Sequence, residues 1–126
     1  MTALVWAGVV VLGGVGAVLR FLVDATVSAR AGRSFPYGTL VVNLSGAFVL
    51  GLLPGLALSR DAALLAGTAT VGAYTTFSTW MFETQRLGED RQVWSLLANL
   101  VVSLVAGLAV AALGRWIGTV WVGSGP

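Results

Sequence analysis

The sequence predicts an all-α integral membrane protein with four transmembrane helices in a single domain, residues 1–126. Composition is the first reason: 57% of the residues are hydrophobic and 10% are charged, whereas an average soluble domain is about 45–50% apolar and about 25% charged. The second reason is that the hydrophobic residues gather into four segments. Each segment is close to the roughly 20 residues that a membrane-spanning helix needs.

The four predicted spans are separated by short polar connections. They cover about residues 3–23, 38–58, 62–82 and 93–114, and the apolar pattern of the fourth can extend through Val122. Four spans place both chain ends on one side of the membrane. Several glycines lie inside the spans and predict close helix–helix contacts, because small residues let helices approach in lipid. Four short helices enclose little volume, so we expect any transport pathway to need a symmetric homo-oligomer.

The arginines indicate an orientation. All seven basic residues are arginine, and five of them lie on the side that carries the first and third connections. These five are Arg20, Arg30, Arg33, Arg86 and Arg91, against Arg60 and Arg115 on the opposite side. Because basic residues favour the cytoplasmic side, this distribution leans toward both termini outside.

The residue types exclude several classes of function. The chain has no cysteine and no histidine, which removes disulfides, thiol chemistry and the commonest general base and metal ligand. The sequence shows no paired carboxylates, phosphate-binding loop or nucleophile–base set, so we expect no enzyme. The arginines form no basic tract, so we expect no nucleic-acid partner.

The third span carries the most informative residues. Thr75, Thr76, Ser78 and Thr79 place four hydroxyls in five residues around the ring of Phe77. Hydrocarbon offers these groups no water, so they must bond the backbone, another helix or a passing solute. Each hydroxyl could bond a carbonyl one turn back, which is common for a single Ser or Thr. Uncharged donors also suit a small anion that must be held and then released.

The same span is predicted to break. Gly67, Gly72 and the adjacent β-branched pair Thr75 and Thr76 all disfavour a continuous helix. An unwound turn in the membrane exposes carbonyl oxygens, which can hold a cation, as the interrupted helices of transporters do.

Other polar residues in the spans leave alternatives open. Asn43 either joins helices through its amide or offers its N–H donors to a water-filled path. Asn99 and Ser103, four residues apart, either bond each other or line the same path. Ser45 is expected to bond its own helix. Glu83 lies near the membrane edge, as a residue at the mouth of a path would.

Three motifs resemble the Fluc (CrcB) family of small fluoride channels, and the similarity covers nearly the whole chain. They are GGVGAVLR at residues 13–20, PYGTLVVNLSG at residues 36–46, and GAYTTFST at residues 72–79 followed by Glu83. The resemblance implies four-helix subunits of the cell membrane that pair antiparallel, in dual topology, as a homodimer. It further implies two pores through which cytosolic fluoride leaves passively, which gives fluoride resistance.

The resemblance also implies roles for individual residues. Arg20 and Glu83 match vestibule residues, and the backbone carbonyls of Gly72 and Thr75 match positions that hold a structural Na⁺ at the dimer interface. One position departs from the family, because Trp80 stands where the second pore aromatic is usually phenylalanine. The residues assigned to the fluoride pore are Asn43, Thr76, Phe77, Ser78, Thr79, Trp80 and Ser103.

The function expected from these features is a fluoride-selective ion channel. Fluoride is strongly hydrated, so a pore must replace its water with converging donors, and fixed positive charge would hold it too tightly for exit. The alternative is a small four-helix proton-coupled multidrug exporter, which needs a carboxylate deep in a span. The first span has none before Asp24. The five-to-two arginine distribution leaves a homologous partner subunit open.

Overall fold

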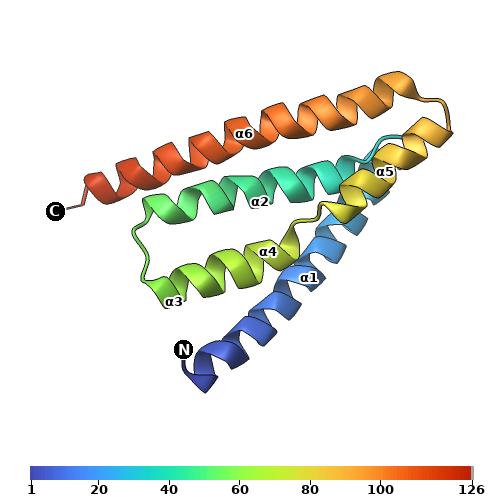
Figure 1. Cartoon of the computed structure of the whole chain (residues 1–126). Helices are drawn as coiled ribbons and strands as arrows, with labels where there is room; N and C mark the ends of the chain where they lie inside the picture. Colours follow the sequence, from blue (N-terminus) through green and yellow to red (C-terminus); the bar gives the residue numbers. More distant parts are fainter. Residues whose placement is uncertain (126) are drawn as a thin grey trace.

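The computed structural model describes residues 1–125, and this part of the chain is all-helical (Figure 1). Two long helices come first, α1 (Ala3–Ala31) and α2 (Tyr37–Gly55). A chain of shorter elements follows, and a third long helix ends the fold. In order these are α3 (Arg60–Ala63), the π-helical segment η1 (Leu64–Val71), α4 (Gly72–Tyr74), α5 (Ser78–Glu89) and α6 (Val93–Gly123).

The chain runs back and forth, so that the two labelled ends lie toward the same end of the bundle (Figure 1). Three helices are long and apolar enough to cross a membrane, namely α1, α2 and α6. At about 1.5 Å per residue, α1 and α6 are each more than about 40 Å long. This length exceeds the thickness of a hydrocarbon core by at least about 10 Å. The protein is therefore a multi-pass membrane protein whose longest helices extend beyond the lipid tails or tilt.

Helix α1 continues eight residues past the predicted end of the first span at residue 23. The added stretch, DATVSARA, is polar enough to leave the hydrocarbon but contains neither glycine nor proline. A helix needs no apolar side chains to propagate, so it ends only at Gly32, whose φ is 80° and whose N–H donates to the Ser28 carbonyl at 3.0 Å. Glycine adopts this positive φ without the steric cost that other residues have.

The third hydrophobic segment differs from the other three. In η1 the Thr70 hydroxyl donates to the Leu65 carbonyl, five residues back, at 2.7 Å. Helix α4 then ends at Tyr74, Thr75 is extended with φ −79° and ψ 159°, and α5 begins at Ser78. The predicted span 62–82 thus corresponds to four consecutive elements and the non-helical residues between α4 and α5.

Glycines allow the close packing of α2 on α6, as predicted. A Cβ built at Gly51 would overlap the Ala111 carbonyl, and one at Gly114 would overlap the Phe48 carbonyl. Across the bundle, a Cβ at Gly16 of α1 would overlap a carbonyl of η1. In each case the obstacle is backbone, which cannot rotate away, so these positions require glycine.

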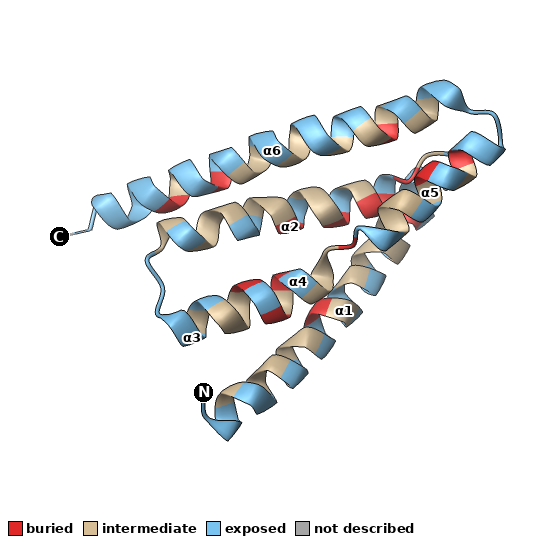
Figure 2. Ribbon diagram, in the orientation of Figure 1, coloured by how far each residue is buried: buried red, intermediate tan, exposed pale blue. Residues whose placement is uncertain are grey.

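Few side chains are fully enclosed by one copy of the chain (Figure 2). Val42, Leu87 and Asn99 are almost completely buried. Many large apolar side chains instead point outward, with Leu4 and Trp94 more than 80% exposed. An apolar exterior is what a lipid-facing bundle presents.

Candidate functional site

Asn43 of α2 is bonded to the backbone of Thr76, in the non-helical turn between α4 and α5. Its Nδ2 donates to the Thr76 carbonyl at 2.8 Å, and the Thr76 N–H donates to its Oδ1 at 2.9 Å. One amide side chain therefore satisfies both polar groups of one peptide residue. This contact matches the first alternative for Asn43, a link between helices, and uses only one of its two N–H groups.

The four hydroxyls of this turn follow two patterns. Thr75 bonds a carbonyl one turn back, that of Val71, at 3.1 Å. Thr76, by contrast, lies within 3.3 Å of the Ser78 hydroxyl and donates to the Thr79 hydroxyl at 3.2 Å. Its oxygen also accepts the Thr79 N–H at 3.1 Å, which caps the first turn of α5. Bonding to the preceding turn thus explains Thr75 alone of these four.

This rearrangement changes the bonding of two carbonyls. In an uninterrupted helix the Thr76 N–H would donate to the Gly72 carbonyl and the Thr79 N–H to that of Thr75. Here these N–H groups donate to the side chains of Asn43 and Thr76. The Thr75 carbonyl instead accepts from Arg20 Nη1 at 3.4 Å.

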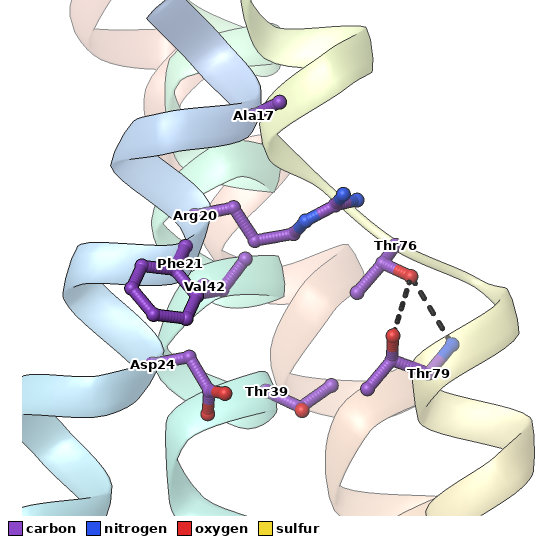
Figure 3. Close-up of a pocket in the computed structure, with 8 residues that line it drawn as sticks. All are labelled: Ala17, Arg20, Phe21, Asp24, Thr39, Val42, Thr76 and Thr79. Atoms are coloured by element: carbon purple, nitrogen blue, oxygen red, sulfur yellow. Dashed lines mark hydrogen bonds between the residues drawn. The ribbon is translucent and has the colours of Figure 1, made fainter.

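A pocket of about 180 Å³ lies beside this turn, between α1, α2 and α5 (Figure 3). The Arg20 side chain extends across it toward Thr76, and Thr39 of α2 lies across from Thr79. The lining residues are Ala17, Arg20, Phe21, Asp24, Thr39, Val42, Thr76 and Thr79.

A second pocket has a volume of about 210 Å³ and shares Asp24 and Thr79 with the first. Three further charged residues line it, Arg33, Glu83 and Arg86. Glu83 lies in it and accepts a hydrogen bond from the Thr39 hydroxyl at 2.6 Å. Arg86 lies there too and donates to the carbonyl of Arg33 at 3.3 Å, which brings the first and third connections together at one end. Arg20 and Glu83 therefore occupy adjoining pockets.

A third pocket, of about 180 Å³, is lined without any charged residue. It joins Asn43 of α2, Trp80 of α5 and Ser103 of α6, three of the residues assigned to the pore. The remaining lining residues are Leu40, Leu44, Ala47, Leu104 and Gly107. Polar groups of Asn43 and Ser103 and the indole of Trp80 thus meet here from three helices that are far apart in sequence.

The two aromatic rings of the turn meet edge to face. The ring centroids of Phe77 and Trp80 lie 5.8 Å apart at an interplanar angle of 79°, an arrangement that aromatic quadrupoles favour. Phe77 is nevertheless 71% exposed in the single subunit, and Ser78 is exposed as well.

Asn99 does not bond Ser103, contrary to one expectation. Its side-chain Nδ2 donates to Thr84 Oγ1 at 2.9 Å, and its backbone carbonyl accepts from Trp80 Nε1 at 3.1 Å. Thr84 donates in turn to the Trp80 carbonyl at 2.8 Å. Thr84 was missed because single Ser or Thr residues in helices commonly bond their own helix. Thr84 lies four residues after Trp80, and this spacing indicates that the two residues share one face of a helix.

The structure thus divides the predicted site residues into connected groups on two faces of α2. Arg20, Thr76, Thr79 and Glu83 belong to the two adjoining pockets, whereas Asn43, Trp80 and Ser103 line the uncharged pocket. Ser45 donates to the Val41 carbonyl at 2.7 Å, as expected of a hydroxyl that bonds its own helix. Within residues 1–125, no group of three acidic, Cys or His residues is placed to hold a metal ion.

Fold and site together define a small multi-pass membrane protein with uncharged donors gathered between its helices. Residues 7–115 match the model of the family described as CrcB-like protein, Camphor Resistance (CrcB), and the chain belongs to this family.

Its relatives share most of its length. A protein of Mycobacterium bovis named fluoride-specific ion channel FluC 2 is 68% identical over 117 residues, 93% of each chain. A protein of the same name from Mycolicibacterium paratuberculosis is 69% identical over 114 residues, 90% of this chain and 93% of the relative. A more distant relative from Leifsonia xyli, named fluoride-specific ion channel FluC 1, is 41% identical and covers this whole chain and 95% of its own.

Proposed function

We propose that this protein is a fluoride-selective ion channel that lets cytosolic fluoride leave the cell passively. The observation that carries the proposal is the 68% identity, over 93% of both chains, to a protein named a fluoride-specific ion channel. It is a channel and not an enzyme, and it needs no coupled energy source.

The uncharged pocket supports a pathway for a small anion. Asn43 uses one N–H for Thr76, which leaves the second for a passing ion. Ser103 adds a hydroxyl on the opposite wall. Aromatic ring edges carry partial positive charge, so the edge of Trp80 extends the donor surface of this pocket. Phe77, whose ring meets that of Trp80 edge to face, is proposed to continue it outside the pocket. These groups replace water around fluoride without a fixed charge that would trap it.

The exposure of the pore residues supports a dimer. Phe77 is 71% exposed, and Ser78 and Gly72 are exposed too, although they belong to the most polar stretch of the third hydrophobic segment. We infer that a second copy of the chain covers them, in inverted orientation, and completes two pores. A homologous subunit could take the same place.

We propose a Na⁺ site on the dimer axis that uses two carbonyls. Those of Gly72 and Thr75 lack their helical donors, because the N–H groups concerned bond Asn43 and the Thr76 hydroxyl. The Thr75 carbonyl also accepts a long bond of 3.4 Å from Arg20, which leaves its second lone pair for an ion. Hard cations prefer several oxygen ligands, so one subunit would supply half of the set and its partner the other half. The ion would hold the two interrupted segments against each other.

The turn at residues 75–77 is proposed to lie near the middle of the membrane. Residues 60–74, from the start of α3 to the end of α4, extend at most about 22 Å, which is short of the roughly 30 Å of hydrocarbon. Helix α5 must therefore complete the crossing, and the turn lies inside the bilayer.

Fluoride efflux from liposomes tests the proposal. The purified chain is reconstituted in vesicles loaded with fluoride or chloride, with an ionophore to balance charge. We expect rapid fluoride release without any proton gradient, and chloride release slower by orders of magnitude. Equal release of both anions would contradict a fluoride-selective channel. Release only under a proton gradient would favour the proton-coupled exporter.

A further inference from the structure

A closed ring of hydrogen bonds joins α5 to α6 beside the uncharged pocket. Its members are Trp80, Thr84 and Asn99, and both polar side chains are buried, with Asn99 1% and Thr84 8% exposed. The direction of each bond is determined. Thr84 donates its only hydroxyl proton to the Trp80 carbonyl, so it can only accept from Asn99. The Asn99 amide must therefore turn its nitrogen toward Thr84.

The indole of Trp80 is held at the other side of this ring. Its N–H donates to the backbone carbonyl of Asn99 at 3.1 Å, and the side-chain bond from Asn99 to Thr84 holds α6 against α5 so that this carbonyl stays within reach. The indole lines the pocket with Asn43 and Ser103. An indole has a single donor and no acceptor. The donor is used by α6, so the pocket receives carbon edges and faces from Trp80 and no N–H.

We propose that Asn99 and Thr84 are positioning residues that fix the Trp80 indole as the aromatic wall of the ion pathway. The inference rests on the proposed channel function and adds to it. The hydrogen bonds among Trp80, Thr84 and Asn99 keep the indole N–H away from the pathway. Without these hydrogen bonds, the indole side chain can rotate. It would then turn its N–H toward the ion or move further into the pocket.

A double-mutant cycle with fluoride efflux tests this positioning role. Thr84→Val keeps the shape of the side chain and removes the hydroxyl, and Asn99→Leu removes the amide. We expect each to slow efflux by roughly tenfold, within the range of coupling between bonded neighbours. In a Trp80→Phe background the same changes should slow efflux less than about twofold, because no indole remains to be positioned. Equal losses in both backgrounds would show a general structural role and overturn the proposal.

Hydrogen exchange of the Trp80 indole N–H gives a readout that does not depend on transport. The protein is labelled with ¹⁵N-tryptophan, and the Trp80 signal is assigned by its loss in Trp80→Phe. We expect slow exchange in the wild type, and exchange at least about tenfold faster in Thr84→Val and Asn99→Leu. Unchanged exchange in both variants would overturn the proposal even if efflux falls.

Two further variants separate positioning from general damage. Thr84→Ser keeps the hydroxyl and should retain wild-type efflux and exchange. Thr119→Val removes another threonine hydroxyl that bonds its own helix, at 2.8 Å to the Trp116 carbonyl, and should change neither. If the wild type releases no fluoride, the channel function fails, and the exchange measurements still decide whether Asn99 and Thr84 hold the indole.

Discussion

Asn43 supplies to Thr76 what a neighbouring strand supplies in a sheet, an acceptor for its N–H and a donor for its carbonyl. In hydrocarbon each unsatisfied backbone group costs several kcal/mol. The side chain would therefore make an open turn tolerable within the bilayer, where the turn is proposed to lie. Its two readings as a link between helices and as a pathway donor are compatible, because an amide nitrogen carries two N–H groups.

Asn43→Asp is expected to lower the stability of the subunit and also to block fluoride efflux. The carboxylate loses the donor to the Thr76 carbonyl and places a second acceptor against it, at a cost of about 1–3 kcal/mol. Thermal unfolding in detergent and fluoride efflux measure the two effects. Ser103→Ala is the matched control, since it lines the same pocket and should slow efflux while the unfolding temperature stays near that of the wild type. Wild-type stability in Asn43→Asp would contradict the role of the amide in supporting the turn.

Phe77→Ile is expected to abolish most fluoride efflux while the protein still assembles. Because Phe77 is 71% exposed in the subunit, its replacement costs little packing within one chain, but an aliphatic surface has no positive rim to face the anion. Efflux and the dimer fraction by size-exclusion chromatography are measured together. Phe82→Ile, at a residue of α5 that is 68% exposed, should conduct far better. Normal efflux in Phe77→Ile would remove this residue from the pore.

At the level of helices, the α2–α6 contact depends on backbone that lies too close for a side chain. Gly114 of α6 packs on the Phe48 carbonyl, and Gly51 of α2 packs on that of Ala111. Lipid tails are as apolar as the helices, so association relies on such close contacts and not on the exclusion of water.

Gly114→Ala should therefore lower the stability of the subunit by about 1–3 kcal/mol, since the added Cβ must force the helices apart. Gly107→Ala in the same helix is the control. Apart from its chain neighbours and the backbone of its own helix, no described atom lies within 4 Å of a Cβ built at Gly107. The better helix propensity of alanine should therefore leave stability equal or slightly raised. Denaturant unfolding of both variants checks this, and equal losses would show that packing on Phe48 is unimportant.

The long hydrophobic segments and the glycine contacts could be predicted from sequence because they are local or repeated properties. The partners of the buried polar groups could not. Thr76 bonds Asn43, 33 positions away, and Asn99 bonds Thr84, 15 positions away on another helix, rather than Ser103 on its own helix. Spacing within one helix shows which residues share a face, whereas the neighbouring helix decides which of them is bonded. Hydropathy also did not predict that α1 extends to Ala31. The end of this helix depends on the residue that terminates it, Gly32.

At the scale of the whole molecule, the arginines are distributed unevenly between the two ends of the bundle. Arg86 contacts the carbonyl of Arg33, so the first and third connections, with most of the arginines, gather at one end of the bundle. The five-to-two distribution is therefore an asymmetry between the two ends of the folded subunit. The proposed inverted pairing requires both orientations of this asymmetric subunit in one membrane.

Single cysteines report the orientation directly, because the chain has no native cysteine. A cysteine at Ser124, beyond α6, should react with a membrane-impermeant maleimide in intact cells, and again after permeabilisation, in comparable amounts. A cysteine at Ser34, in the connection near the opposite end, should give the same two-sided result. Labelling of either site from one side alone would establish a fixed topology and point to a homologous partner of opposite orientation.

The turn held by Asn43 also constrains the order of events during synthesis. A ribosome delivers α2 to the membrane well before residues 75–77 emerge, so the amide that receives Thr76 is already in place when the open turn arrives. A nascent chain lacking α2 would bring unbonded peptide groups into lipid, where no water replaces the missing partner. The third hydrophobic segment therefore depends on its predecessor to enter the bilayer, and damage at Asn43 should appear first as failed insertion and degradation of the new chain.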